Sequence, residues 1–173
     1  MKVTENNINQ YKKEGWLSIP KLIRESATNE LLYGFVQILQ RISPNVFPNE
    51  SNNLSWRSHE LSSALIKFRS EDPNKFSIFY DSLQTSYALQ RIFSSNIIAE
   101  TVAALLNEPI ETISMTDFIL RMDPPDDTRN RLEWHQDSSY FINNISGDNG
   151  VVCFIALSGA NEEEGALEIC PQS

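Results

Sequence analysis

The sequence has few basic residues and no long apolar run, and each shortage excludes a class of protein. Its 173 residues include 14 lysines and arginines against 23 acidic residues, which leaves a formal net charge of −9. Nucleic-acid binders need clustered basic residues to neutralise phosphates, so we expect no nucleic-acid partner. No apolar run approaches the roughly 20 residues that a membrane span requires, and residues 1–7 contain no apolar signal core. We therefore expect a cytoplasmic protein with no membrane partner.

Cysteine and histidine are also scarce, with two of each. Cys153 and Cys170 lie in apolar surroundings without CxxC spacing, which predicts buried free thiols rather than a disulfide or a zinc site. His59 lies in a polar stretch with helix-like surroundings, which is typical of a surface or capping residue. The predicted strand alternation does not bring the Cys153 and His135 side chains together. Ser158-Gly159 lacks the pattern of a nucleophile elbow. Neither a thiol enzyme nor a serine hydrolase is therefore favoured.

The spacing of apolar residues changes from a helical to a strand period about two-thirds of the way along the chain. Helices are predicted before Gly15, over residues 26–42, from Asp72-Pro73 and from Ser95. Alternating residues predict strands at 17–20, 112–122, 135–141, 151–157 and 166–170. These patterns predict an α+β fold with helices packed on one side of a mainly antiparallel sheet. We expect one domain over residues 1–173, mainly helical over 1–110 and mainly β over 111–173.

The most informative stretch is Trp134-His135-Gln136-Asp137, which places an imidazole and a carboxylate two residues apart. On extended backbone, residues i and i+2 point to the same side, whereas on a helix the same spacing turns them to nearly opposite sides. An extended segment would therefore bring His135 and Asp137 together. This pair supplies two-thirds of the 2-His-1-carboxylate triad of non-haem Fe(II) oxygenases. A solvated His beside an Asp is also common, so both interpretations stay open.

Arg121 ends an otherwise apolar predicted strand. A guanidinium can bind a carboxylate through two parallel hydrogen bonds, which would suit an anionic small molecule. A charge at the wet end of a strand fits the pattern equally well, so both interpretations stay open here too. Arg129 and Arg131, in the polar loop before Trp134, are more typical of solvated residues.

Four segments, in this order, resemble the phytanoyl-CoA dioxygenase (PhyH) family. Tyr11–Pro20, YKKEGWLSIP, resembles the family's opening, where an aromatic residue and a glycine precede a short strand ending in proline. Leu120–Pro125, LRMDPP, and then Trp134–Asp137, WHQD, resemble the approach to the family's HxD metal motif and the motif itself. Gly165–Ser173, GALEICPQS, looks like the family's G-x-L-x-x-x-P-G-S-H segment, with Gln172 in place of the usual glycine.

The resemblance implies an Fe(II)- and 2-oxoglutarate-dependent dioxygenase that hydroxylates a small organic substrate with O₂. It also implies N-terminal helices packed on a double-stranded β-helix (jelly-roll) core, of which this sequence holds an incomplete part. His135 and Asp137 would be iron ligands. Arg121 is the nearest match to a residue that contacts the 2-oxoglutarate carboxylate in some members. Related halogenases have a small residue at the place of Asp137, so its carboxylate favours hydroxylation.

The family's distal metal histidine, and the arginine that clamps the far carboxylate of 2-oxoglutarate, lie beyond the segment that residues 165–173 resemble. The resemblance therefore implies the N-terminal portion of the family domain, and no position here is assigned either role. Two alternatives to an active dioxygenase stay open. One is a catalytically inactive truncated paralogue or interaction module of the same fold, and the other is a cupin-like isomerase that uses the same metal pair without O₂. The sequence identifies neither the substrate nor the oligomeric state.

Overall fold

The regular structure in the described part of the chain is helical. The computed structural model describes residues 3–46, 54–115, 118–124, 132–137, 150–159, 161 and 166–172. In these residues the chain forms six α-helices and one short 3₁₀ helix: α1 (Glu5–Glu14), α2 (Glu25–Ile42), α3 (His59–Glu71), α4 (Pro73–Gln84), α5 (Tyr87–Phe93), α6 (Asn96–Leu106) and η1 (Ile110–Thr112).

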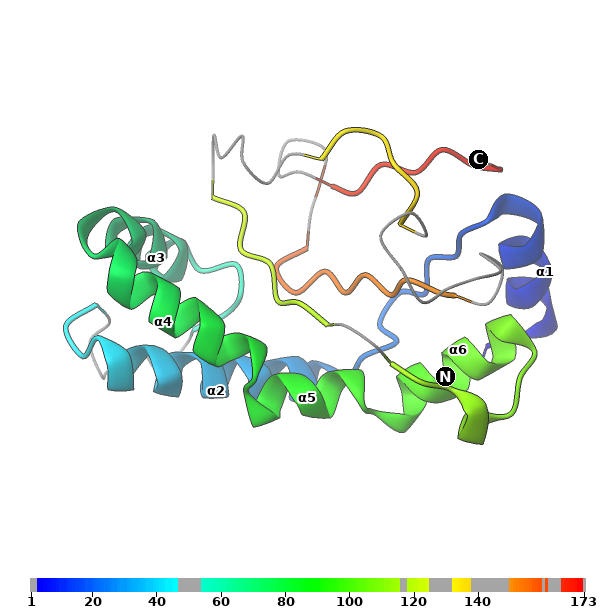
Figure 1. Ribbon diagram of the computed structural model, residues 1–173, viewed down its shortest axis with the longest axis horizontal. Helices are drawn as coiled ribbons and strands as arrows, with labels where there is room; N and C mark the ends of the chain where they lie inside the picture. The colour runs from blue at the N-terminus through cyan, green and yellow to red at the C-terminus, as the bar shows by residue number, and fades with distance from the viewer. Residues whose placement is uncertain are drawn as a thin grey trace.

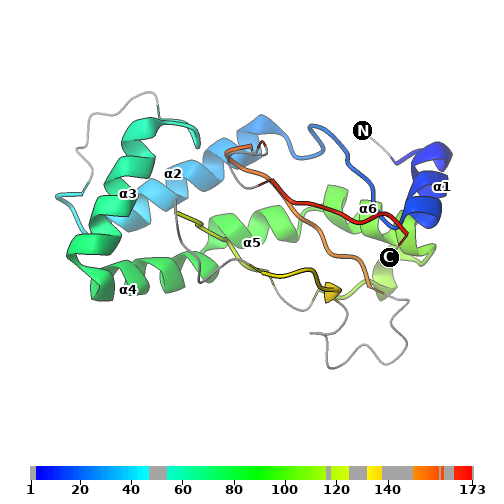
Figure 2. The same cartoon turned by 90° about the horizontal axis from the view of Figure 1, so that it is seen from above.

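The helices α2 to α6 form one layer, and the later segments of the chain run over one side of it (Figure 1). The long helix α2 packs against α4 and α5, α3 packs against α4, and α1 packs against α6 at the other end of the layer. Seen from above, the described segments 118–124, 150–159 and 166–172 cross the helical layer as extended chain (Figure 2). The layer is thus the base on which these segments lie.

Local capping chemistry explains where the predicted helices begin and end. Gly15 ends α1 with a φ of 78°, a left-handed conformation that glycine adopts at little cost. The Asp72 carboxylate accepts a hydrogen bond from the Lys75 N–H and so caps α4, whose first residue is Pro73. This backbone hydrogen bond and the nearby Lys75 ammonium lower the pKa of Asp72. The predicted starts and stops of these helices are confirmed, as is the predicted start after Ser95.

Aromatic rings fill the centre of the helical layer. Phe79 is fully buried and meets Phe35 edge to face, with ring centroids 5.0 Å apart and an interplanar angle of 87°. Phe68 and Phe76 complete the cluster at centroid distances of 6.2 and 6.1 Å from Phe79.

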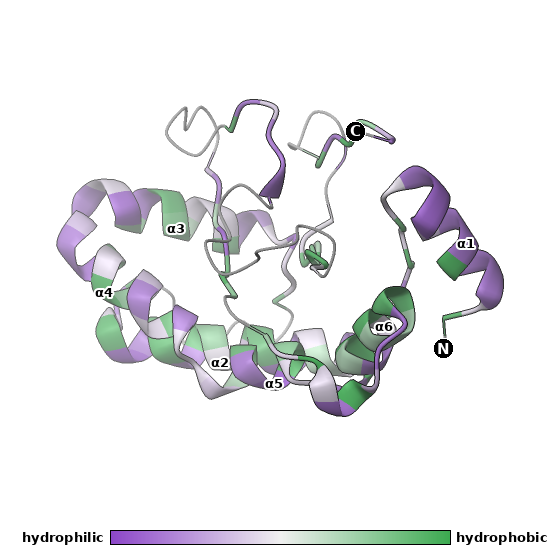
Figure 3. Cartoon of the chain, turned by 45° about the vertical axis from the view of Figure 1, so that its right-hand side comes forward, coloured by the Kyte–Doolittle hydropathy of each residue, from purple (hydrophilic) through white to green (hydrophobic). Residues whose placement is uncertain are grey.

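Figure 3 shows that α6 is predominantly hydrophobic, whereas α1 is predominantly hydrophilic. Among the helices of the described residues, none combines the length and the apolar character that crossing a membrane requires.

The predicted jelly-roll core is wrong for the part of the chain that the structure describes. No described residue belongs to a β-strand, including those of the five predicted strands at 17–20, 112–122, 135–141, 151–157 and 166–170. Residues 138–141 of the third predicted strand lie outside the described residues. A β-strand exists only where its backbone pairs with a neighbouring strand. Alternation in the sequence indicates extended backbone and the side that each residue faces, but it does not supply that neighbour.

The extended segments are held by contacts with the helices and the loops that connect them, rather than by the backbone hydrogen bonds of a sheet. The Leu120 N–H donates to Gln84 Oε1 at 2.8 Å, and Gln84 Nε2 donates to the Leu120 carbonyl oxygen at 3.0 Å. The Arg57 guanidinium donates to the Ser158 carbonyl oxygen. The Gln172 N–H donates to the Glu14 carbonyl oxygen at 3.1 Å, where α1 ends. The period-2 alternation survives without a sheet, because Leu120 is buried while Ile119 is exposed.

The two cysteines are thiols outside any disulfide, as predicted, but both are exposed residues rather than buried ones. Partial burial of the Cys153 thiol nevertheless raises its pKa. Burial disfavours the thiolate, and the thiolate is the form that reacts with alkylating agents.

Iodoacetamide alkylates Cys153 at half its maximal rate at a certain pH. We expect this pH to be higher in the folded chain than in the chain unfolded in urea. A Cys170→Ser variant leaves Cys153 as the only thiol and makes the rate attributable to one group. Equal or lower half-maximal pH in the folded chain would contradict the burial of this thiol.

Candidate metal centre

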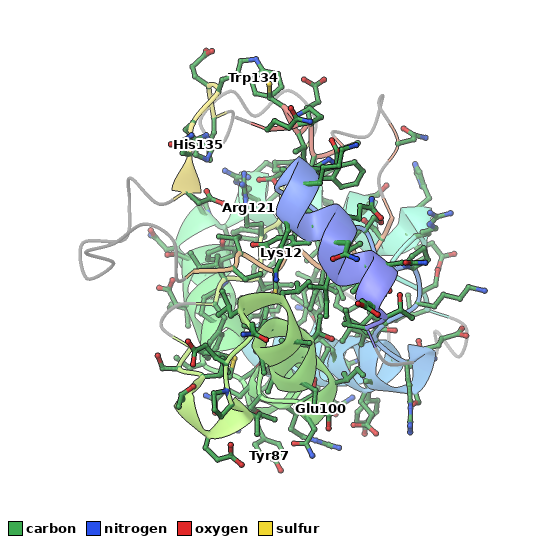
Figure 4. All side chains as sticks on the ribbon, turned by 90° about the vertical axis from the view of Figure 1, so that its right-hand side faces the viewer. Lys12, Tyr87, Glu100, Arg121, Trp134 and His135 are labelled. Carbon is green, nitrogen blue, oxygen red and sulfur yellow. The ribbon has the colours of Figure 1, made fainter. Side chains whose placement is uncertain are left out.

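The structure brings the imidazole of His135 and the carboxylate of Asp137 into contact. His135 Nε2 lies 3.2 Å from Asp137 Oδ1, and the two side chains are 27% and 47% exposed. Figure 4 shows His135 on the opposite side of the molecule from Tyr87 of α5, so the pair lies away from that helix. The chain bends at Trp134, and none of residues 132–137 is part of a strand. The convergence predicted for a strand is therefore reached on bent backbone.

A backbone carbonyl determines which nitrogen of His135 faces the carboxylate. The Glu133 carbonyl oxygen lies 2.6 Å from His135 Nδ1. A carbonyl oxygen can only accept, so Nδ1 must carry the proton and donate it. In the neutral ring this leaves the lone pair of Nε2 directed at Asp137. This is the arrangement by which a histidine is oriented as a metal ligand, with its other ring nitrogen donating to a carbonyl.

The contact between the two side chains is favourable when a proton or a metal cation lies between them. The Nε2 lone pair and the carboxylate oxygen are both acceptors, and two acceptors 3.2 Å apart repel each other. A proton on Nε2 satisfies the contact as an imidazolium–carboxylate ion pair. A cation bound by both atoms satisfies it equally, with one nitrogen and one oxygen ligand. The residues thus fit a divalent metal, since neutral imidazole and carboxylate are ordinary ligands of Fe(II).

Trp134, the residue before the pair, lies at the surface. It is 69% exposed and lies at the edge of the molecule in Figure 4. Tyr140 and Phe141, the aromatic residues that follow the pair in the sequence, lie outside the described residues, as do Arg129 and Arg131. Within the described ranges, no group of three or more His, Cys, Asp or Glu side chains is placed to hold a metal ion. Among the described residues, the candidate centre therefore consists of His135 and Asp137.

The second histidine is placed as the sequence predicts. His59 is the first residue of α3 and is exposed, with its ring near the Ser63 hydroxyl at 3.3 Å. It belongs to the helical layer and forms no part of the His135–Asp137 pair. This makes His59 a natural control for any experiment on His135.

Arg121 lines a cavity of its own. Its guanidinium contacts the Asp123 carboxylate at 3.3 Å. The cavity beside it has a volume of 350 Å³, and the described residues that line it include neither His135 nor Asp137. Arg69 lines the same cavity, and the sequence did not predict this. Arg69 belongs to α3, and the segment that carries Arg121 follows about fifty residues later in the chain. The predicted contact of Arg121 with 2-oxoglutarate stays a prediction.

Comparison with known proteins identifies one family. The family described as Phytanoyl-CoA dioxygenase (PhyH) matches residues 11–173. No curated protein and no solved structure matches the chain. The family match spans nearly the whole sequence and includes both the HxD pair and the segment of Arg121. The chain therefore belongs to the phytanoyl-CoA dioxygenase family.

Proposed function

We propose that this chain takes part in Fe(II)- and 2-oxoglutarate-dependent oxygenation of a small organic substrate, with His135 and Asp137 as metal ligands. The observation that carries the proposal is the 3.2 Å contact between His135 Nε2 and the Asp137 carboxylate. Membership of the phytanoyl-CoA dioxygenase family supports the class of reaction. When bound, the iron would supply redox chemistry with O₂ that no protein side chain can perform.

The chain's own contribution is orientation. The Glu133 carbonyl accepts the Nδ1 proton of His135 and so directs Nε2 toward Asp137. Asp137 supplies the negative charge that balances part of the charge of a divalent ion. Two protein ligands leave most coordination positions open for small molecules, which suits a co-substrate and O₂. The same openness makes the metal affinity low, because each missing ligand removes a bond that a tighter site would have.

Anaerobic calorimetric titration with Fe(II) tests the proposal. We expect one ion to bind to the wild-type chain, and we expect His135→Ala and Asp137→Ala each to weaken binding by about tenfold or more, since each removes a direct ligand. Addition of 2-oxoglutarate is expected to tighten Fe(II) binding in the wild-type chain, because two ligands of one ion bind cooperatively.

Two matched variants serve as controls. His59→Ala removes the other histidine of the chain, and Asp81→Ala removes an exposed carboxylate on α4. Both are expected to keep the wild-type affinity for Fe(II). Unchanged iron binding in His135→Ala would overturn the proposed centre. Iron binding that 2-oxoglutarate leaves unchanged would remove the co-substrate from the proposal and favour a non-catalytic member of the family.

A further inference from the structure

The cavity beside Arg121 lies between the helical layer and the extended segments that cross it. Its volume is 350 Å³. Helices α2, α3 and α4 contribute one side, and residues 120–124 and 157–158 contribute the other. A cavity of about 150 Å³ with apolar walls is large enough to bind benzene, so this cavity has room for a ligand of about two rings.

Half-buried apolar side chains form much of the cavity wall. Five of them come from the helical layer, its connections and the extended segments: Trp56, Leu65, Phe76, Met122 and Leu157. Because these side chains are only partly buried, some of their hydrocarbon surface is open to solvent. A molecule that covers this surface removes it from water, and this removal is the main source of free energy in apolar binding.

The uncharged polar side chains of the wall are hydrogen-bonded to the protein itself. The Trp56 indole N–H donates to the Thr28 carbonyl oxygen at 3.1 Å. The hydroxyl groups of Ser62 and Ser158 each donate to a nearby backbone carbonyl oxygen, at 3.4 and 3.1 Å. These three donors are therefore satisfied without a ligand, and an apolar ligand leaves their hydrogen bonds intact.

The charged side chains of the wall also have partners within the chain. The Arg121 guanidinium contacts the Asp123 carboxylate at 3.3 Å, and the Arg69 guanidinium lies 5.8 Å from the centroid of the Phe76 ring. Both arginines have further interactions with the protein. A charged ligand would lose its water and compete with these existing partners, whereas an uncharged ligand does neither. The walls therefore favour an uncharged, apolar molecule.

Aromatic rings in the wall favour an aromatic ligand over a saturated one of the same size. Phe35 and Trp56 both line the cavity and already pack edge to face, with ring centroids 5.4 Å apart. Such contacts between rings contribute free energy beyond that of the area they bury. The thioether of Met122 also makes favourable contacts with aromatic rings.

We propose that this cavity binds an uncharged aromatic molecule of about two fused rings, which packs against Trp56, Phe76 and Met122. The site is separate from the His135–Asp137 pair, since neither of these residues lines the cavity. The proposal therefore goes beyond the proposed oxygenation and does not depend on the iron centre.

Calorimetric titration of the whole chain with 2-naphthol, an uncharged aromatic molecule, tests the site. We expect one molecule to bind per chain. Ser62→Phe adds a ring at the cavity wall without changing charge, and we expect it to weaken binding by about tenfold. Phe76→Leu replaces an aromatic wall with an aliphatic one, and we expect it to weaken binding by about threefold to tenfold. Circular dichroism melts establish that each variant is folded.

Two matched variants serve as controls. Ser63→Phe makes the same exchange at the next residue of α3, which is not among the residues that line the cavity. Phe93→Leu removes a half-buried ring of α5 that stacks on another ring outside the cavity. Both are expected to bind 2-naphthol as the wild-type chain does. In methyl NMR spectra, 2-naphthol should shift the resonances of Leu65 and Leu157 and leave those of Leu105 on α6 unchanged.

Three analogues of the probe separate charge from aromatic character. 2-Naphthoate carries a negative charge, 2-naphthylmethylammonium carries a positive charge, and decahydro-2-naphthol keeps the size and the hydroxyl group but has no aromatic ring. Each is expected to bind several-fold more weakly than 2-naphthol. The proposal is overturned if 2-naphthol does not bind, if any of the three analogues binds as tightly, or if Ser63→Phe loses as much affinity as Ser62→Phe.

Discussion

Replacing Phe79 with alanine is expected to lower the free energy of unfolding by about 3–5 kcal/mol, the range observed for buried phenylalanines. The ring is fully buried and contacts three other phenylalanine rings. Its removal takes away apolar surface that was out of water and leaves a void that the surrounding helices fill only in part. Because whole domains are stable by only about 5–15 kcal/mol, this loss would bring the chain close to unfolding at room temperature.

Urea denaturation followed by circular dichroism measures this loss, and a neighbouring residue provides the control. Ile78 precedes Phe79 in α4 but is 57% exposed, so Ile78→Ala should change the unfolding free energy far less. Phe79→Leu should fall between the two, because leucine refills part of the void. A Phe79→Ala variant as stable as Ile78→Ala would mean that the aromatic cluster does not form the centre of the helical layer.

Replacing Gln84 with leucine is expected to cost about 2–3 kcal/mol, because it leaves a buried peptide group without hydrogen-bond partners. Gln84 both accepts from the Leu120 N–H and donates to the Leu120 carbonyl, and Leu120 is only 6% exposed. A single side chain thus replaces the two bonds that a neighbouring strand would make.

The matched control is Gln37→Leu on α2, which exchanges the same side chains at an exposed helical position. We expect this variant to unfold at nearly the wild-type urea concentration. Hydrogen exchange at the Leu120 amide gives a direct readout, since the amide should exchange much faster in Gln84→Leu. Wild-type protection of that amide in Gln84→Leu would show that another group, rather than Gln84, accepts its hydrogen bond.

The cavity beside Arg121 and the His135–Asp137 pair depend on the helical layer to different degrees. The cavity at Arg69 and Arg121 uses side chains of α2, α3 and α4 directly, so it should respond to substitutions in the core of the layer. The contacts of His135 that define its orientation are local, to the Glu133 carbonyl and to Asp137.

The contact between His135 and Asp137 could be predicted from four consecutive residues because its geometry is local. Two side chains separated by one residue meet on extended or bent backbone alike, so the error about the strand did not move His135 away from Asp137. The environment of Arg121 could not be predicted in this way. Its cavity depends on Arg69, Phe76 and other residues of helices that are far away in the sequence.

The sequence by itself determined four of the helices, α1, α2, α4 and α6, since caps such as Asp72 and Gly15 and the helical repeat act within a few residues. It also determined the alternation of buried and exposed residues around Leu120, because that follows from extended backbone alone. Only the tertiary structure decided what the extended segments bond to. A strand and a solitary extended segment have the same local pattern, and they differ only in the partner that satisfies the backbone, which here is the side chain of Gln84.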